Sequence, residues 1–304
     1  MCLDRFGRKV TTLRISITEK CNLNCIYCHR EGTSIYTGVE LTPSELSLLV
    51  EAAAELGIRK VKLTGGEPLM REDVVEAVEA VAKAPGVVEV SMTTNGTLLA
   101  KYASSLARAG LKRVNVNLPS LKPERYRRIT GFDLMEEVKR GLFEAAKTGL
   151  EPIKINMVVL KGLNVDEIHE MINFAAEVPA ILQLIELEKL GYASSKLYDE
   201  LYYDLTPIEN WLENKAVKVV FRSLHNRRKY VLPEGQEVEV IRPFHGRFCM
   251  GCSRMRVTAN GRLKPCLMRE DNTLEVKEAL RKGDVEGIKE LLRKAVELKE
   301  PYCL

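Results

Sequence analysis

Six of the eight cysteines in this 304-residue chain form two triplets near its opposite ends. In chain order they are Cys21, Cys25, Cys28, Cys249, Cys252 and Cys266. Close cysteine spacing of this kind is typical of metal binding in an intracellular protein. An iron–sulfur cluster normally takes four cysteine ligands, so a triplet leaves one iron open to a ligand that is not protein. The spacing therefore predicts two open metal centres that can do chemistry.

The composition is that of an ordinary globular protein, with 45% hydrophobic and 29% charged residues. The length predicts about two domains. No stretch is apolar enough for a signal peptide or a membrane span, so we expect a cytoplasmic protein without a membrane partner. The net charge of +4 is too mild to predict nucleic-acid binding. We interpret the basic stretch at 222–229 as an exposed loop.

Strand and helix patterns alternate through the first two thirds of the chain. Apolar residues at every second position predict strands at 11–18, 60–63, 87–92, 113–116, 153–160 and 181–187. Helical periodicity and capping residues predict helices at 43–56, 71–83, 98–109, 165–176 and 123–147, the last interrupted near 130. Repeated β-α steps predict a parallel sheet covered by helices.

The pattern changes after Trp211 to short strands at 217–221, 229–232 and 237–241, followed by the second triplet. Asn260-Gly261 predicts a hairpin turn, and two polar helices are expected at about 274–282 and 285–298. We therefore divide the chain into residues 1–215 and residues 216–304. The first part is predicted to be an α/β fold, an incomplete (β/α)6 TIM-like barrel, and the second an α+β domain that covers its mouth.

The first triplet follows the first predicted strand, and loops at the carboxyl ends of barrel strands form the active face. Cys21-Asn22-Leu23-Asn24-Cys25-Ile26-Tyr27-Cys28 resembles the signature of radical S-adenosylmethionine (SAM) enzymes, with an aromatic residue before the last cysteine. Gly65-Gly66-Glu67-Pro68, after the second strand, resembles the segment of that superfamily that holds the methionyl amine of SAM. A lone Gly-Gly-Glu-Pro is typical of an ordinary turn, but the two motifs together at this spacing predict a radical SAM barrel.

The second triplet narrows the resemblance. The stretch from Cys249 to Arg256, with Asn260-Gly261 and Cys266, resembles the carboxyl-terminal cluster of the GTP 3′,8-cyclase family of molybdenum cofactor biosynthesis. Further segments similar to that family lie at 13–18, 62–68, 93–96, 114–118, 154–162 and 185–186. The likeness covers nearly the whole chain in order.

This resemblance implies two [4Fe–4S] clusters and SAM as cofactors, with GTP as substrate. Reduction of the first cluster would cleave SAM to methionine and a 5′-deoxyadenosyl radical, which removes the 3′ hydrogen of GTP. The ribose radical then attacks C8 of guanine, giving 3′,8-cyclo-7,8-dihydro-GTP, while the second cluster's open iron holds the purine. The family also implies a low-potential electron donor, not identified by the sequence, and a downstream pyranopterin-forming enzyme. A homodimer stays open.

The same resemblance implies the site residues. SAM contacts are expected from Tyr27, Gly66, Asn117 and Glu188. GTP contacts are expected from Arg14, Lys62, Thr93, Lys154, Arg254, Met255 and Arg256, with Arg14, Arg254 and Arg256 as the catalytic residues. Guanidinium groups bind phosphate bidentately, and lysine acts as a point charge. Arg254 and Arg256 also lie two residues apart on a predicted strand, which puts both side chains on one face.

Some positions depart from the family pattern. Asn117 and Pro119 stand where the family often has Ser and Asp, and Glu188 stands where it has Met near the adenine. Many members end in Gly-Gly, whereas this sequence ends in Pro301-Tyr302-Cys303-Leu304. We carry no role for a Gly-Gly tail over to this chain.

Two other functions fit the cysteines. A radical SAM peptide maturase also uses a barrel with an auxiliary cluster, although such proteins usually carry more cysteines. A non-catalytic zinc module would use the triplets as closed sites, with His245 completing the second one. His29, directly after Cys28, is not expected to be a ligand because three thiolates already satisfy the pattern.

Overall fold

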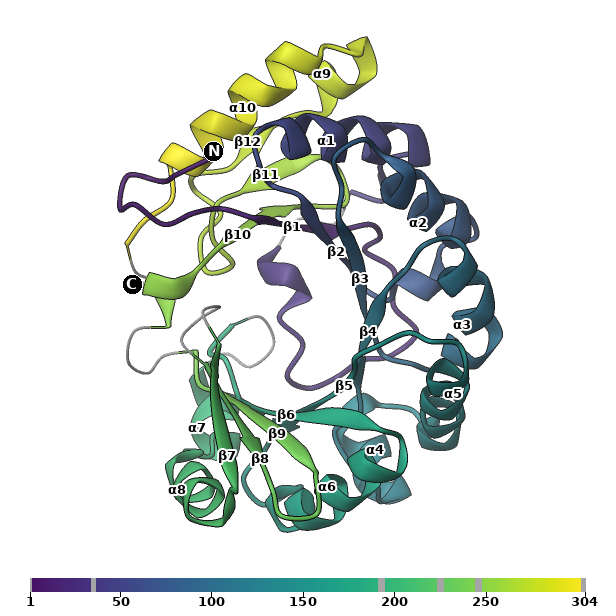
Figure 1. Cartoon of the computed structure of the whole chain (residues 1–304), viewed down its shortest axis with the longest axis vertical. Helices are drawn as coiled ribbons and strands as arrows, with labels where there is room; N and C mark the ends of the chain where they lie inside the picture. Colours follow the sequence, from purple (N-terminus) through teal and green to yellow (C-terminus); the bar gives the residue numbers. More distant parts are fainter. Residues whose placement is uncertain (1, 34–36, 191–194, 223–226, 244–247, 302–304) are drawn as a thin grey trace.

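The computed structural model describes residues 2–33, 37–190, 195–222, 227–243 and 248–301. Within these residues, twelve strands form one strongly curved sheet, with helices on its outer side (Figure 1). The order along the sheet is β12-β11-β10-β1-β2-β3-β4-β5-β6-β9-β8-β7. The strands are β1 (Thr12–Ser16), β2 (Lys60–Thr64), β3 (Glu89–Thr94), β4 (Arg113–Asn117), β5 (Ile153–Val159), β6 (Ala180–Glu186), β7 (Lys218–Arg222), β8 (Arg227–Val231), β9 (Glu237–Ile241), β10 (Arg254–Val257), β11 (Arg262–Lys264) and β12 (Leu274–Glu275).

The first six strands are parallel and sequential neighbours, and each pair is joined through a segment that contains a helix. The helices are α1 (Pro43–Glu55), α2 (Val74–Lys83), α3 (Leu99–Arg108), α4 (Pro123–Thr130), α5 (Met135–Lys147), α6 (Ile168–Glu177), α7 (Ser195–Leu201), α8 (Thr206–Lys215), α9 (Lys277–Lys282) and α10 (Val285–Glu297). The predicted incomplete (β/α)6 barrel is therefore confirmed. Helices α7 and α8 were not predicted.

Helix α1 shows why the sequence-based boundaries hold. The Thr42 hydroxyl accepts a hydrogen bond from Glu45 N, and Thr42 N donates one to the Glu45 carboxylate, which forms a capping box around Pro43. Its buried face, which includes Leu46, Leu49 and Val50, joins the hydrophobic core between helices and sheet. This packing fixes β1 and β2, which flank α1 in the chain.

The carboxyl-terminal strands extend the barrel sheet at both of its edges. Strand β9 pairs in parallel with β6, and the β7-β8-β9 meander continues that edge. Strand β10 pairs in parallel with β1, so that Arg14 lies opposite Arg256, and β11 follows as its hairpin partner. The division of the chain at residue 215 stays a prediction. The pairing shows that strands formed by residues after 215 extend the barrel sheet at both of its edges.

Alternate residues of these strands have opposite surroundings. On β2 and β4, Val61, Leu63, Val114 and Val116 are buried in the core. The residues between them line a cavity inside the barrel; they include Lys62, Thr64, Asn115 and Asn117. Strands of a parallel sheet are usually apolar on both faces. Here the inner face is polar, so the barrel encloses a lined chamber.

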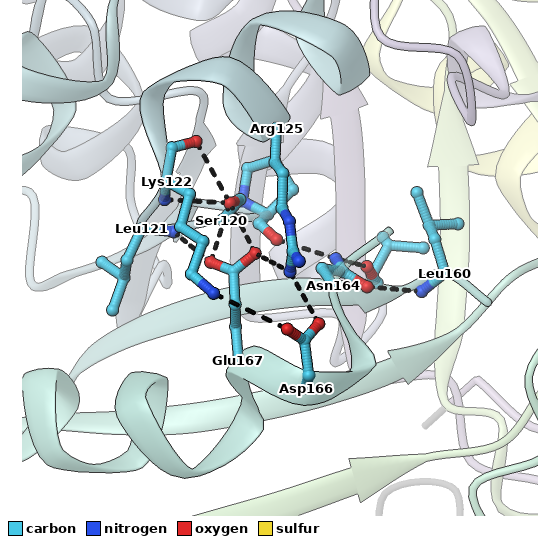
Figure 2. A network of polar contacts seen from close by, with 10 residues as sticks. Ser120, Leu121, Lys122, Arg125, Leu160, Asn164, Asp166 and Glu167 are labelled. Carbon is cyan, nitrogen blue, oxygen red and sulfur yellow. Dashed lines mark hydrogen bonds and ion pairs between the residues drawn. The ribbon is translucent and has the colours of Figure 1, made fainter. Parts of the chain in front are cut away.

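The loop that follows β4 is held by two side chains at the start of the α6 segment (Figure 2). Asn164 donates from Nδ2 to the carbonyl of Pro119 over 2.7 Å. Glu167 accepts a hydrogen bond from Ser120 Oγ over 2.8 Å. Both Asn164 and Glu167 are fully buried. This network fixes the backbone that directly follows Asn117, a predicted SAM contact. Pro119 takes part in it through its carbonyl oxygen, which accepts the hydrogen bond from Asn164.

None of the helices in the described part of the chain has the length and apolar character needed to cross a bilayer.

Candidate active site

The first cysteine triplet forms one wall of the chamber. Cys21, Cys25 and Cys28 all line the cavity of about 350 Å³ that most of the other predicted site residues also line, termed the main cavity, and also a neighbouring cavity of about 460 Å³. Backbone hydrogen bonds to the end of α4 fix the loop: Asn24 N donates to Thr130 O over 2.9 Å and Ile26 N to Ile129 O over 3.0 Å. The predicted position of this triplet, at the carboxyl end of β1, is therefore where the structure places it.

The surroundings of these thiols fit an iron–sulfur cluster. The Sγ of Cys21 accepts from Leu23 N at 3.4 Å and faces Asn95 Nδ2 at 4.0 Å. Hydrogen bonds of this kind stabilise iron-bound thiolates. Burial raises the pKa of the Cys25 thiol to about 12, and the neighbouring Cys28 and Cys21 add to the rise. Iron binding would therefore have to displace this proton, as metal ligation does.

The Gly65-Gly66 segment packs directly against the chain that enters the triplet. Gly66 N donates to Thr18 O over 2.8 Å, and Glu67 N donates to Lys20 O over 2.6 Å. A Cβ on Gly66 would collide with the Lys20 carbonyl. The approach therefore requires glycine.

We expect Gly66→Ala to weaken SAM binding at least about tenfold and to destabilise the protein by about 1–3 kcal/mol, because the colliding atoms are backbone and cannot turn away. Isothermal titration with SAM and thermal unfolding of the reconstituted protein measure both effects. Gly235→Asn is the control, since Gly235 lies in a turn with open space around it and Asn tolerates its positive φ. Wild-type SAM affinity in Gly66→Ala would contradict this assignment.

Glu67 of the same segment is a fully buried carboxyl group. It accepts hydrogen bonds from Thr94 Oγ1 and Asn95 N, both at 2.6 Å. Burial raises the pKa of Glu67 to about 7. These bonds tie the glycine segment to the carboxyl end of β3, so three consecutive loops of the active face are locked together.

The predicted SAM residues all line the main cavity. Asn117 donates from Nδ2 to the hydroxyl of Tyr27 over 2.6 Å, which connects β4 to the cysteine loop. Glu188 lines this cavity and also the smaller one at the second triplet. Its Oε2 is buried and has no hydrogen-bond partner among the residues that the structure describes, so Glu188 offers an acceptor at the boundary of the two cavities.

The predicted nucleotide residues surround the same space, since Arg14, Lys62, Thr93, Lys154, Arg254 and Arg256 all line it. Burial lowers the pKa of Lys62 well below its usual range, and nearby Arg14 adds to the effect. Burial likewise lowers the pKa of Arg254 to about 9, with Arg14 and Arg256 contributing. These cations are desolvated and repel one another. A bound polyanion would offset both the desolvation of the cations and the repulsion between them.

Met255 is the exception among the predicted nucleotide residues. Its side chain is fully buried in the hydrophobic core, because it points to the face of β10 opposite Arg254 and Arg256. A nucleotide contact from Met255 would therefore have to come from its backbone.

Glu31, which the sequence reasoning missed, is the counterion of two of these arginines. It accepts from Arg14 Nη2 at 2.5 Å and from Arg256 Nη1 at 2.7 Å. Burial alone would raise the pKa of Glu31, but Arg14 and Arg256 outweigh it and hold this pKa well below the usual range. No sequence signal singled out this position beyond its closeness to Cys28.

Glu239 of β9 plays the same part at the other side of the chamber. It is fully buried and pairs with Lys154 at 2.7 Å, with Arg227 at 3.8 Å and with Arg222. Burial alone would raise the pKa of Glu239, but these cations, Lys154 foremost, lower it to about 2. The alternation of acidic and apolar residues in Glu237–Ile241 indicates a strand with two faces, but it does not show which glutamate is buried.

The second triplet lines its own cavity of about 100 Å³ together with Arg254 and Arg256. Because these two arginines line both cavities, the second triplet adjoins the chamber that the first triplet also lines. Among the residues that the structure describes, no three His, Cys, Asp or Glu side chains are grouped so as to hold a single metal ion. His245, the candidate for a closed zinc site, lies outside the described residues.

Comparison with known proteins decides the family. The Radical SAM superfamily model matches residues 15–175, and the Molybdenum Cofactor Synthesis C model matches residues 180–303. The probable GTP 3′,8-cyclase of Thermococcus kodakarensis is 49% identical over 99% of both chains. The chain belongs to the GTP 3′,8-cyclase family of radical SAM proteins. The probable GTP 3′,8-cyclase of Methanothermobacter thermautotrophicus is 45% identical over 98% of both chains.

Solved structures share the fold of this family member. Streptococcus suis SuiB bound to S-adenosylmethionine has a TM-score of 0.67 at 15% identity, covering 91% of this chain and 65% of that chain. Native anSMEcpe with bound AdoMet has a TM-score of 0.61 at 19% identity, covering 95% and 81%. This likeness confirms the predicted barrel fold, and the Radical SAM superfamily match confirms the superfamily. Membership of the superfamily brings SAM and an iron–sulfur cluster as cofactors.

Proposed function

We propose that this protein converts GTP to 3′,8-cyclo-7,8-dihydro-GTP, with SAM and two [4Fe–4S] clusters. The observation that carries the proposal is one cationic chamber that adjoins both cysteine triplets, with Arg254 and Arg256 lining both cavities. The family match and the names of the relatives support GTP as substrate. They do not favour the peptide maturase or the zinc module.

The bound cofactors would supply a 5′-deoxyadenosyl radical at the first triplet and an open iron at the second. The chain's own part is placement. Tyr27, Gly66, Asn117 and Glu188 would hold SAM beside the first triplet, where they line the cavity. The cations between the triplets would bind the triphosphate, and the second triplet would hold the base. Misplacement by about 1 Å can cost ~100-fold in rate, so this fixed frame matters.

Arg14 and Arg256 keep donors available for the nucleotide while bound to Glu31. Arg14 uses Nε and Nη2 on this carboxylate, which leaves Nη1. Arg256 uses Nη1 on it, which leaves Nε and Nη2. Glu31 thus sets the direction of both guanidinium groups. We assign these two groups to the triphosphate and ribose, because a planar guanidinium can donate two parallel hydrogen bonds to the oxygen atoms of such groups.

The test is reconstitution of the anaerobic protein with dithionite, SAM and GTP. Formation of 5′-deoxyadenosine together with a cyclised nucleotide is expected. If 5′-deoxyadenosine forms at the same rate without GTP, or if a peptide replaces GTP as the required partner, the proposal is wrong. Candidate electron donors can be tested in the same assay by using them in place of dithionite. A pyranopterin-forming enzyme added to the assay would consume the cyclised product. Sedimentation of the loaded protein would test a homodimer.

Nucleotide affinity should fall as the pH rises through 8. Burial lowers the pKa of Lys154 to about 8, although Glu239 opposes the shift. At pH 9 only about a tenth of the free protein would carry this proton, so the apparent dissociation constant should rise about tenfold from pH 7. The lowered pKa values of Lys62 and Arg254 affect both proteins alike. Lys154→Arg, whose guanidinium has the higher intrinsic pKa, is therefore the control for these groups and for titration of the nucleotide itself. An identical pH profile in both proteins would exclude Lys154 as the titrating group.

A further inference from the structure

Lys299 places a buried ammonium group among the segments that carry the second triplet. It follows α10 and is only 3% exposed. Its Nζ donates to Arg254 O over 2.7 Å and to Pro265 O over 3.0 Å, and it lies 3.8 Å from Cys252 Sγ. Lys299 therefore joins the chain after Cys252 to the chain before Cys266.

The charge of Lys299 is compensated only in part. Its hydrogen-bond acceptors among the described residues are two carbonyls and one sulfur, none of which carries a full negative charge in the thiol form. An unpaired buried ammonium is costly. A [4Fe–4S]²⁺ cluster held by three thiolates would provide this negative charge, because its net charge is −1. Reduction by one electron makes the net charge of the cluster and its thiolates −2.

We propose that Lys299 is a positioning residue for the cluster held by the second triplet and that it raises the reduction potential of this cluster. Its ammonium holds the two cysteine-bearing segments together and donates an N–H···S bond to Cys252. Hydrogen bonds to sulfur and nearby charge are among the determinants of cluster potential. The inference rests on the proposed function, because it requires the second cluster.

Arg8 provides a matched control in the same cavity. It donates from Nη1 to Cys249 O over 3.0 Å and to Pro301 O over 3.1 Å, so it also clamps this loop to the chain's last described residues. Its charge, however, is paired with the buried Asp4 at 2.6 Å. Arg8 therefore contributes to position with little net charge at the sulfur atoms.

The experiment is an anaerobic redox titration, followed by electron paramagnetic resonance, of the reconstituted full-length protein and its Lys299→Met, Lys299→Gln, Lys299→Arg and Arg8→Gln variants. At a fixed potential, Lys299→Met should reduce the reduced-to-oxidised ratio of the second cluster at least about tenfold, which is about 59 mV for one electron. The first cluster is the internal reference and should not move. Lys299→Arg, which keeps the charge, should stay within about threefold.

An unchanged potential in both Lys299→Met and Lys299→Gln, or an equal shift in Arg8→Gln, would overturn the inference. If Lys299→Met fails to assemble the second cluster, the positioning role is supported and Lys299→Gln decides the effect of the charge. A wild-type protein that reconstitutes with one cluster would instead refute the proposed function. The two failures are therefore distinguishable.

Discussion

Replacing Cys25 by Ala is expected to lower SAM cleavage to below a thousandth of the wild-type rate, which corresponds to about 4 kcal/mol of barrier. Cys25 lies in the middle of the loop that lines both the main cavity and a second cavity beside Gly66. Without it the first cluster would lose one of three protein ligands. Anaerobic chromatography of 5′-deoxyadenosine, with iron and sulfide analysis, measures the loss.

Replacing Cys252 by Ala should have a different outcome. The second triplet lies beyond Arg254 and Arg256 in a separate cavity, so the first site should still cleave SAM. We expect 5′-deoxyadenosine without cyclised nucleotide, because the base would no longer be held. If both variants lose both products equally, the triplets do not have separate roles.

Replacing Glu239 by Leu is expected to destabilise the protein by about 3–5 kcal/mol, since it leaves Lys154 and Arg227 without their buried counterion. For a chain of this length, that loss should lower the thermal midpoint by roughly 5–8 °C. Differential scanning fluorimetry of the anaerobic protein measures the shift. Nucleotide binding should also weaken, because Lys154 loses the partner that orients it.

The same strand supplies the control for Glu239. Glu237 forms a partly exposed pair with Lys229, and such pairs contribute about 0–1 kcal/mol, so Glu237→Gln should be nearly neutral. The double variant Lys154→Met with Glu239→Leu should be more stable than Glu239→Leu alone, because it removes one of the stranded charges. A midpoint for Glu239→Leu within 2 °C of the wild type would show that this carboxylate does not balance the buried cations.

The barrel and most of the site could be predicted because their signals are local. Alternating strands and capped helices follow from short-range periodicity, and the family motifs lie next to strands. Arg254 and Arg256 could be placed on one face from their spacing alone. The same spacing puts Met255 on the other face of the strand. The resemblance implied a nucleotide contact for Met255, but the strand geometry does not allow its side chain to make one.

Glu31, Glu239 and Lys299 could not be predicted in the same way. Each gains its role from a partner that is distant in the sequence: Arg256 for Glu31, Lys154 for Glu239 and Cys252 for Lys299. Long-range pairing of β1 with β10 and of β6 with β9 creates the first two contacts, and α10 packs against β11 to bring Lys299 to the second triplet. Nothing within a short sequence window distinguishes such residues from surface charges.

The parallel pairing of β1 with β10 joins the two ends of the chain. Contacts between such distant segments form slowly, because the intervening loop must first lose its entropy. During synthesis the first triplet can therefore be complete on the ribosome while Arg254 and Arg256 are still unmade. We expect the nascent protein to acquire its nucleotide pocket last, so that a product truncated before β10 does not retain it.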